Sequence, residues 1–394
     1  SISGSSRSPT KSSSTRSPQK AWDRLEIFEG LARRNLSLLE LDLPSPLVDL
    51  LEVVEPLTSG IGVISPSAKD AITSHPRPII SIGIDDSKYS ARRDTYGPTP
   101  STEHVLNILE AAANCEQNSH HESTWNTEVH QRVLETALRF RSSNQPKSNL
   151  FAQPVNFTAC TTAGIGIGKP PLAPFQKIDF CLYIDPAKVG GPEGEDYIKT
   201  IDAVRKSIPD HYQSINHTDH FPPRRNPITV SIETKRSGDN WDEAGLRIAV
   251  WQAAQWNFLR WMAQGDTDGD SSSSSRAVGD MRHETRNDLG LEFLPGIVIM
   301  GHEWFLTATT NDGKSTTFWS RVQIGSTESA LGVYKIICVV QYLAQWSRDV
   351  YWPWFRQTIL KSNPTRTHPK TVRRPGDIHV HGHGIGSRSA AGFI

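Results

Sequence analysis

The chain contains little cysteine and carries no excess of either charge. Only four of its 394 residues are cysteine, and Cys115, Cys160, Cys181 and Cys338 are too widely spaced for a C-x-x-C metal motif or a dense disulfide framework. We therefore expect four reduced, buried thiols. The 42 basic residues balance the 42 acidic ones, so no overall charge draws the protein to nucleic acid or to an anionic membrane. Contact with nucleic acid would have to come from a local patch.

Long hydrophobic runs and internal repeats are also missing. No apolar run reaches the roughly 18–20 residues that cross a bilayer, and the Ser/Arg-rich start has no apolar segment typical of a secretory signal. These absences predict an intracellular protein, nuclear or cytoplasmic, with no membrane partner. No period of roughly 20–50 residues recurs, which argues against solenoids and propellers. The sequence gives no indication of an oligomeric state.

Composition divides the chain into regions. Residues 1–20 are rich in Ser, Thr, Pro and basic residues without apolar periodicity, which predicts a disordered tail. Residues 21–115 alternate short apolar stretches with Pro-, Ser- and Gly-rich segments and predict peripheral helices and loops. The main domain is expected over 116–361, interrupted by a polar, low-complexity and disordered insertion at 265–289. The basic, His- and Gly-rich residues 362–394 predict a second disordered tail.

Helical and strand-like patterns follow one another between 116 and 361. A helix is expected first, then three strands, a second helix that is apolar on nearly all sides, further strands, and closing helices. This order predicts an α/β fold with a central mixed sheet flanked by helices. The expected helices are 122–140, 240–262 and 327–360, and the expected strands are 155–162, 177–185, 228–235, 293–310 and 315–324.

Two of the expected strands carry acidic side chains. In residues 228–235 the two-residue period of a strand places Glu233 and Lys235 on one face with Thr229 and Ser231. In residues 177–185 the same period places Asp179 opposite its apolar neighbours. If the two strands pair, Asp179 and Glu233 can converge on one cation. The apolar side chains expected on the opposite faces are Ile178, Phe180, Leu182 and Ile184 in one strand and Ile228, Val230 and Ile232 in the other.

This pattern fits a metal site. Asp179, Glu233 and the main-chain carbonyl of Thr234 form an all-oxygen ligand set suited to Mg²⁺ or Mn²⁺. Such an ion lowers the pKa of a bound water and neutralises charge on a phosphate. Lys235 can position or deprotonate that water, or stabilise the phosphate by its charge. The alternative is that these side chains form only the wet face of an antiparallel sheet.

The expected first helix adds polar groups to the same site. Glu122, Asn126 and His130 share one helical stripe with Trp125 and Val129, so they point toward the sheet. Buried polar groups need partners, which a metal site supplies. Glu122 and His130 are therefore candidate metal ligands. The alternatives are that Glu122 lies in solvent at the helix end and that His130 is a core histidine with its hydrogen bonds satisfied.

Five segments of the chain carry a family resemblance: ESTWNTEVH at 122–130, KIDFCLYID at 177–185, SIETK at 231–235, WQAAQW at 251–256 and VQIGSTES at 322–329. They resemble the PD-(D/E)XK nuclease-like domain found in a broad group of fungal proteins. The resemblance covers residues 122 to about 356 and implies a restriction-endonuclease-like core. It also implies that Asp179 and Glu233 bind the metal and that Lys235 is the catalytic lysine.

The resemblance extends to one branch of that superfamily. His130 is similar to the first-helix histidine of the RecB-like branch, and Gln252 is similar to its helix glutamine, which makes Gln252 a candidate catalytic residue. Trp256 stands where the branch usually has tyrosine, so the helix motif matches only in part. Some members of the superfamily have lost activity, so the resemblance allows a module that binds without cutting.

We therefore expect a metal-dependent nuclease that hydrolyses phosphodiester bonds in DNA or RNA. The alternatives are a catalytically inactive module of the same fold that binds nucleic acid or protein, and a different enzyme built on the same metal site.

GIGIGK at 164–169 does not form a phosphate-binding loop, because Ala163 and Pro170 replace the Gly and the Ser/Thr that such a loop requires. A set of basic residues is expected to form either a phosphate-binding rim or ordinary solvated surface: Arg139, Arg141, Arg224, Arg225, Lys235 and Arg236.

Overall fold

The computed structural model describes residues 17–140, 149–174, 176–189, 193–208, 212–220, 223–264 and 289–361. The tail expected at 362–394, nearly all of the insertion expected at 265–289, and residues 1–16 lie outside these described residues. Helix α1 (Pro18–Glu29) begins within the range 1–20 expected as a tail, so residues 18–20 are helical, with a proline in the first turn. No helix within the described ranges is long and apolar enough to cross a membrane.

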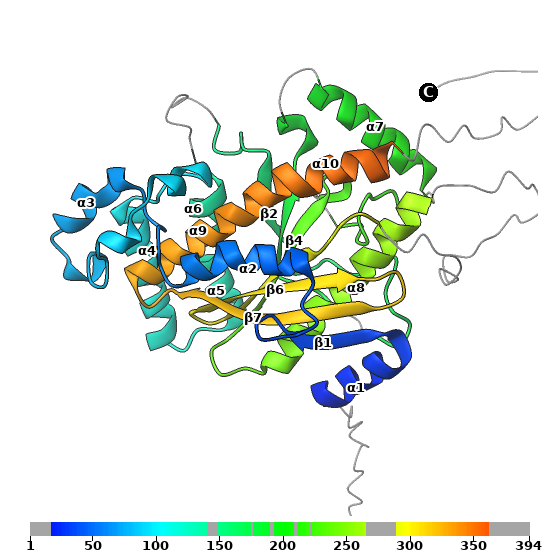
Figure 1. Ribbon diagram of the computed structural model, residues 1–394, viewed down its shortest axis with the longest axis horizontal. Coiled ribbons are helices and arrows are strands. Elements are labelled where there is room, and N and C mark those ends of the chain that lie inside the picture. The colour runs from blue at the N-terminus through cyan, green and yellow to red at the C-terminus, as the bar shows by residue number, and fades with distance from the viewer. Residues whose placement is uncertain are drawn as a thin grey trace, which may run out of the picture.

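A single mixed sheet forms the centre of the molecule (Figure 1). Its seven strands lie in the order β1-β7-β6-β5-β4-β3-β2. β1 pairs parallel with β7 and β4 pairs parallel with β5, whereas the other neighbours are antiparallel. The predicted mixed α/β sheet is confirmed. The strands are β1 (Leu31–Asn35), β2 (Val155–Ala159), β3 (Phe180–Ile184), β4 (Ile228–Lys235), β5 (Leu294–Met300), β6 (Glu303–Asn311) and β7 (Thr316–Ser326).

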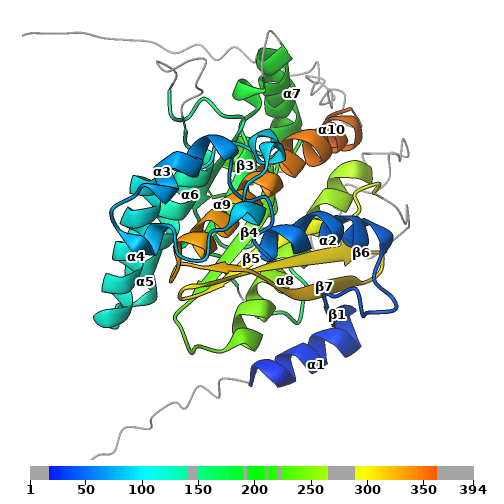
Figure 2. The ribbon, with the colours of Figure 1, turned by 60° about the vertical axis from the view of Figure 1, so that its left-hand side comes forward.

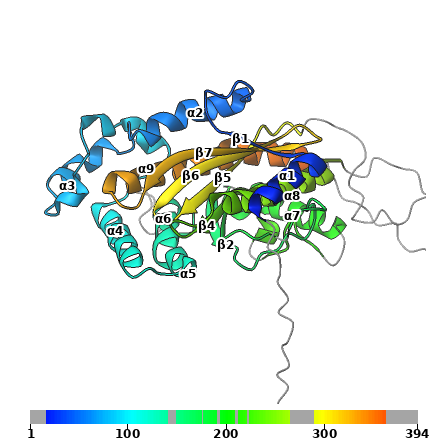
Figure 3. The ribbon, with the colours of Figure 1, turned by 90° about the horizontal axis from the view of Figure 1, so that it is seen from below.

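Different helices cover the two faces of the sheet (Figure 3). Val298 and Phe318 pack against α8 (Trp241–Gln264) and α1, whereas Ile297 and Ile299 belong to a larger apolar cluster around α9 (Ala330–Trp346). Burial on both sides explains why α8 is apolar nearly all round. The remaining α-helices are α2 (Ser45–Thr58), α3 (Lys69–Thr73), α4 (Thr102–Gln117), α5 (Glu122–Trp125), α6 (Gln131–Leu138), α7 (Glu193–Ser207) and α10 (Trp352–Phe355).

Short 3-10 and π-helical turns join these elements. The π-helical segment η5 (Asn126–His130) links α5 to α6, so the expected first helix is continuous but carries a wide turn at its polar stripe. Figure 2 shows α3, α4, α5 and α6 gathered at one end of the sheet. The other short turns are η1 (Pro66–Ala68), η2 (Pro78–Ile80), η3 (Asp86–Lys88), η4 (Ala91–Thr95), η6 (Pro186–Lys188), η7 (Pro223–Arg225), η8 (Ser347–Tyr351) and η9 (Arg356–Leu360).

Residues 21–115 are more closely built into the domain than we expected. They form helices, but β1 also joins the sheet, and Leu47, Leu51 and Val54 of α2 lie in the same buried cluster as α9. The guanidinium of Arg93 is fully buried and donates hydrogen bonds to the carbonyl of Val63 at 2.9 Å and to Gln341 Oε1 of α9 at 2.6 Å. The domain boundaries themselves stay a prediction.

A β-bulge interrupts β4 and changes which side chains share a face. Leu182 pairs with Val230 and Tyr183 with Ile228, so Thr229 is the extra residue. Ile228 consequently packs on the α8 side, whereas Val230 packs on the α9 side. Thr229 also faces the α9 side, where its hydroxyl accepts a hydrogen bond from Ser347 at 2.8 Å. The expectation that Ile228 shares a face with Val230, and Thr229 with Glu233, was therefore wrong, because the two-residue period fails at a bulge.

Candidate active site

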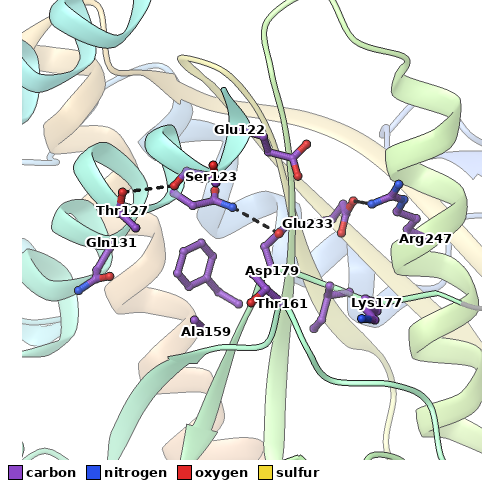
Figure 4. Close-up of a pocket in the computed structure, with 13 residues that line it drawn as sticks. Glu122, Ser123, Thr127, Gln131, Ala159, Thr161, Lys177, Asp179, Glu233 and Arg247 are labelled. Carbon is purple, nitrogen blue, oxygen red and sulfur yellow. Dashed lines mark hydrogen bonds and ion pairs between the residues drawn. The ribbon is translucent and has the colours of Figure 1, made fainter. Parts of the chain in front are cut away.

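The antiparallel pair β3 and β4 brings the predicted acidic residues together where β3 begins and β4 ends. Asp179 immediately precedes β3 and Glu233 lies near the end of β4. Both line a pocket of about 460 Å³ that also receives Glu122 from α5 and Arg247 from α8. In Figure 4 the side chains of Asp179, Glu233 and Glu122 converge on this space from three different elements. The predicted pairing of the two strands is confirmed.

Hydrogen bonds fix the direction of the Asp179 carboxylate. One oxygen, Oδ2, accepts from the main-chain N–H of Thr234 at 2.9 Å and from its hydroxyl at 3.0 Å. The other, Oδ1, accepts from Asn126 Nδ2 of η5 at 3.3 Å. Because Asp179 stands just outside β3, strand alternation does not extend to it: Ile178 packs on the α8 side and Phe180 on the α9 side. The prediction that Ile178 and Phe180 share a face was wrong for this reason.

Glu233 is a buried carboxylate with one oxygen left without a partner. Its side chain is 1% exposed, and Oε1 accepts from Lys235 Nζ at 2.8 Å and from Arg247 Nη1 at 3.1 Å. Oε2 is buried and has no hydrogen-bond partner among the described residues. Burial raises the pKa of Glu233 to about 8, the charge of Asp179 adds to this rise, and Lys235 and Arg247 oppose it. An additional cation beside Oε2 would stabilise the ionised form of Glu233 and lower this pKa again.

The ammonium of Lys235 is held by three oxygens. It donates to Glu233 Oε1 at 2.8 Å, to the main-chain carbonyl of Thr234 at 2.9 Å and to Glu122 Oε2 at 3.2 Å. Burial lowers the pKa of Lys235, but the charge and hydrogen bond of Glu233 and the charge of Glu122 together outweigh this effect, so the pKa lies above its ordinary value of 10.5. Lys235 is therefore a charged group, and the oxygens that surround it are three of the predicted metal ligands.

The residues of this pocket fit a hard divalent cation. Glu122, Asp179, Glu233 and the Thr234 carbonyl supply only oxygen donors, which Mg²⁺ and Mn²⁺ prefer. The buried Oε2 of Glu233 has no hydrogen-bond partner among the described residues that would compete with a cation. In the described part of the chain, no three His, Cys, Asp or Glu side chains are already grouped as a ready-made metal cluster. The donor chemistry is present, with the Lys235 ammonium between Glu122 and Glu233.

Two further predicted residues lie outside the lining of the pocket. His130 is fully buried, its Nδ1 lies 2.9 Å from Asn126 Oδ1 and its Nε2 lies 3.2 Å from the carbonyl of Gly301. Burial lowers the pKa of His130 to about 4, so its ring is neutral near pH 7. Gln252 is also buried and donates to the carbonyl of Pro295 at 2.8 Å, at the start of β5. Metal binding by His130 and catalysis by Gln252 stay predictions.

Arg247 is a site residue that we did not predict. It reaches the pocket from α8, where Nη1 donates to Glu233 at 3.1 Å and Nη2 donates to Glu243 at 2.6 Å. Arg247 lies on a helix outside the two strand patterns, so the two-residue period gave no sign of this role. The one available signal was its position as the single charged residue in the apolar stretch 244–251 of that helix. Asn126 was placed correctly on the polar stripe, but its bond to Asp179 was not foreseen.

Comparison with protein families gives an independent result. A family model described as the PD-(D/E)XK nuclease superfamily matches residues 80–352. No curated protein and no solved structure matches the chain. The matched range covers most of the chain and includes Asp179, Glu233 and Lys235, and the mixed sheet with helices on both faces agrees with it. The chain therefore belongs to the PD-(D/E)XK nuclease superfamily.

Proposed function

We propose that this protein is a divalent-metal-dependent nuclease that hydrolyses phosphodiester bonds in nucleic acid. One observation carries the proposal: the Glu233 carboxylate is buried in a pocket with Asp179 and is paired with Lys235, and its Oε2 has no hydrogen-bond partner in the described part of the chain. A carboxylate that serves only a salt bridge has little reason to be buried with half of its bonding capacity unused.

Asp179, Glu233 and the Thr234 carbonyl are the residues that would hold Mg²⁺ or Mn²⁺, with Glu122 as a further ligand. When bound, the ion supplies Lewis-acid chemistry: it lowers the pKa of a bound water and neutralises charge on the phosphate. Asn126 keeps the Asp179 carboxylate in place through its bond to Oδ1. His130 in turn contacts Asn126, which gives it a positioning role.

Lys235 and Arg247 supply the positive charge for the phosphate. Both contact Glu233 Oε1, so two cations stand beside this carboxylate. The Arg247 side chain is 32% exposed and the Lys235 side chain 6%, which leaves Arg247 the more accessible of the two to an incoming phosphate. A fixed cation next to the reacting phosphate stabilises the negative charge that develops during hydrolysis.

Cleavage of labelled nucleic acid tests the proposal. The purified protein is incubated with single- and double-stranded DNA and RNA in Mg²⁺, in Mn²⁺ or in EDTA, beside Asp179→Asn. We expect cleavage of at least one substrate with either metal, and none in EDTA or with Asp179→Asn. As a matched control, Asp349→Asn removes the same charge from an exposed ion pair with Arg348 and should cleave normally. Binding of nucleic acid without cleavage under all metal conditions would instead favour the inactive binding module.

A further inference from the structure

A second cavity lies between the end strand β1, its neighbour β7 and the start of α8. Its volume is about 830 Å³, and its lining includes three arginines, Arg33, Arg34 and Arg321, together with Trp241. We call it the arginine cavity. Figure 1 shows β1 and β7 side by side above α1, at the opposite edge of the sheet from β2. The arginine cavity is therefore separate from the pocket at β3 and β4.

Arg321 is placed in this cavity by a β-bulge. Leu306 pairs with Val322 and Thr307 with Ser320, so Arg321 is the extra residue of β7. Bulges turn a side chain out of the regular alternation and are frequent beside functional sites. The exposed Arg321 side chain lies over two rings, with Cζ 4.7 Å from the centre of Trp241 and 5.0 Å from that of Phe305.

Arg321 differs from its neighbours in its charge partners. Arg33 pairs with Asp242 at 2.6 Å and Arg34 pairs with Glu26 at 3.6 Å, and all four side chains are at least one-third exposed. Within the described ranges no carboxylate forms an ion pair with Arg321, although Glu40 and Asp242 also line the cavity. Stacking on aromatic rings holds the guanidinium plane and leaves its N–H groups to bind an anion. Because exposed ion pairs contribute little stability, Arg33 and Arg34 can exchange their partners for a phosphate.

The arginine cavity lies within reach of the proposed active site. Trp241 and Arg247 are six residues apart on α8, which corresponds to about 9 Å along the helix axis. Three strand spacings separate β4 from β7, or about 14 Å. A nucleic-acid strand advances about 3.4 Å per nucleotide in a duplex. A strand cut beside Glu233 would therefore reach Arg321 after only a few nucleotides.

We propose that the arginine cavity is a second binding site for the substrate strand, in which Arg321 contacts a backbone phosphate and Trp241 stacks on a base. This inference rests on the proposed nuclease function. A single strand is the favoured ligand, because its bases are open to aromatic stacking whereas those of a duplex are not. Planar guanidinium groups suit phosphate oxygens, to which they can donate two parallel hydrogen bonds.

Binding measured without cleavage tests this site. A fluorescein-labelled single strand of about 15 nucleotides is titrated with the full chain in EDTA, and fluorescence anisotropy is followed at several salt concentrations. We expect Arg321→Ala and Trp241→Ala each to weaken binding about tenfold. For Arg321→Ala the slope of log affinity against log salt should also fall by about 0.7. Arg321→Lys keeps the charge but loses the planar guanidinium, so its affinity should lie between those of the unmutated protein and of Arg321→Ala.

Arg92→Ala is the matched control. Arg92 of η4 is also exposed and has no ion pair among the described residues, but it lies near Tyr342 of α9, on the other side of the sheet. Its loss changes the net charge equally and should leave affinity unchanged. Unlabelled oligonucleotide should compete far better than inorganic tripolyphosphate at equal phosphate concentration. Equal competition, or equal weakening by Arg92→Ala, would overturn recognition of a strand at this cavity.

The outcomes separate this inference from the proposed function. Cleavage by the unmutated protein together with unchanged binding in Arg321→Ala overturns the second site and leaves the nuclease proposal intact. Weakened binding in Arg321→Ala without cleavage by the unmutated protein supports the second site and overturns hydrolysis. Circular dichroism melting curves show whether each variant is folded, and the exposed position of Arg321 predicts that Arg321→Lys folds normally.

Discussion

Among single residues, Glu233 shows the conflict between burial and charge most clearly. It lies near the end of β4 with its side chain 1% exposed, and the positive charges of Lys235 and Arg247 offset only part of the effect of burial. Asp179 differs, because main-chain and side-chain donors satisfy both of its oxygens. The pocket thus combines a carboxylate whose two oxygens both accept hydrogen bonds with one whose Oε2 has no partner among the described residues. Because of this difference, the roles of Asp179 and Glu233 can be tested by separate substitutions.

The stability of the metal-free protein should depend on the titration of Glu233. Its folded-state pKa of about 8 lies above the ordinary value of 4.5, so the native state holds this proton more tightly than the unfolded state does. The resulting contribution is fully present below about pH 4.5 and is lost as the pH rises through about 8. Thermal melts in EDTA from about pH 5 to about pH 9 should show a steeper decline for the unmutated protein than for Glu233→Gln. Parallel curves would contradict the raised pKa.

Lys235 should matter for chemistry more than for substrate binding. Lys235→Met keeps the length of the side chain and removes the ammonium that contacts Glu233 and Glu122. We expect kcat/KM for cleavage to fall by at least about 100-fold, because a fixed charge near the reacting phosphate is lost. Affinity for the oligonucleotide in EDTA should change much less. Cleavage within threefold of the unmutated rate would place Lys235 outside the reaction.

At the scale of elements, the pairing of β3 with β4 could be predicted from the sequence, but its details could not. Alternating residues in 228–235 and 177–185 indicated two strands whose acids converge, and they do. The bulge at Thr229 was hidden, because an extra residue leaves no mark in a pattern that is apolar before and after it. β1 was missed for another reason. Its five residues, LARRN, are short, basic and without alternation, and only Leu31 is buried.

The attachment of residues 60–98 to α9 should depend on one arginine. Arg93 donates to three main-chain carbonyls and to Gln341, and none of its guanidinium is exposed. Arg93→Met leaves these buried acceptors without partners, so we expect a loss of about 2–4 kcal/mol in the free energy of unfolding. Its exposed neighbour gives the control, because Arg92→Met should change stability by less than about 0.5 kcal/mol. Urea unfolding monitored by tryptophan fluorescence measures both, and equal effects would argue against an anchoring role for Arg93.

For the whole molecule, the fold could be predicted from sequence, because the five family-like segments lie on the expected helices and strands and so indicate the order of these elements. The sequence was not enough to predict the arginine cavity, whose residues come from β1, β7 and α8 and meet only in the folded chain. The basic rim considered from sequence stays a prediction: Arg141 lies outside the described residues, and other members already have partners within the fold. Arg139, for example, donates to Glu135 and Asn156 and stacks on Phe157. Charge that balances overall, 42 against 42, is compatible with a local cationic surface.

The central claim is that Asp179 and Glu233 together bind a divalent ion, and a crystal grown with Mn²⁺ tests it most directly. The anomalous scattering of manganese locates the ion without any assumption about activity. We expect one strong anomalous peak in contact with the carboxylates of both Asp179 and Glu233, and its disappearance in Asp179→Asn. A pocket without an anomalous peak at saturating Mn²⁺, or a peak bound elsewhere on the protein, would contradict the account.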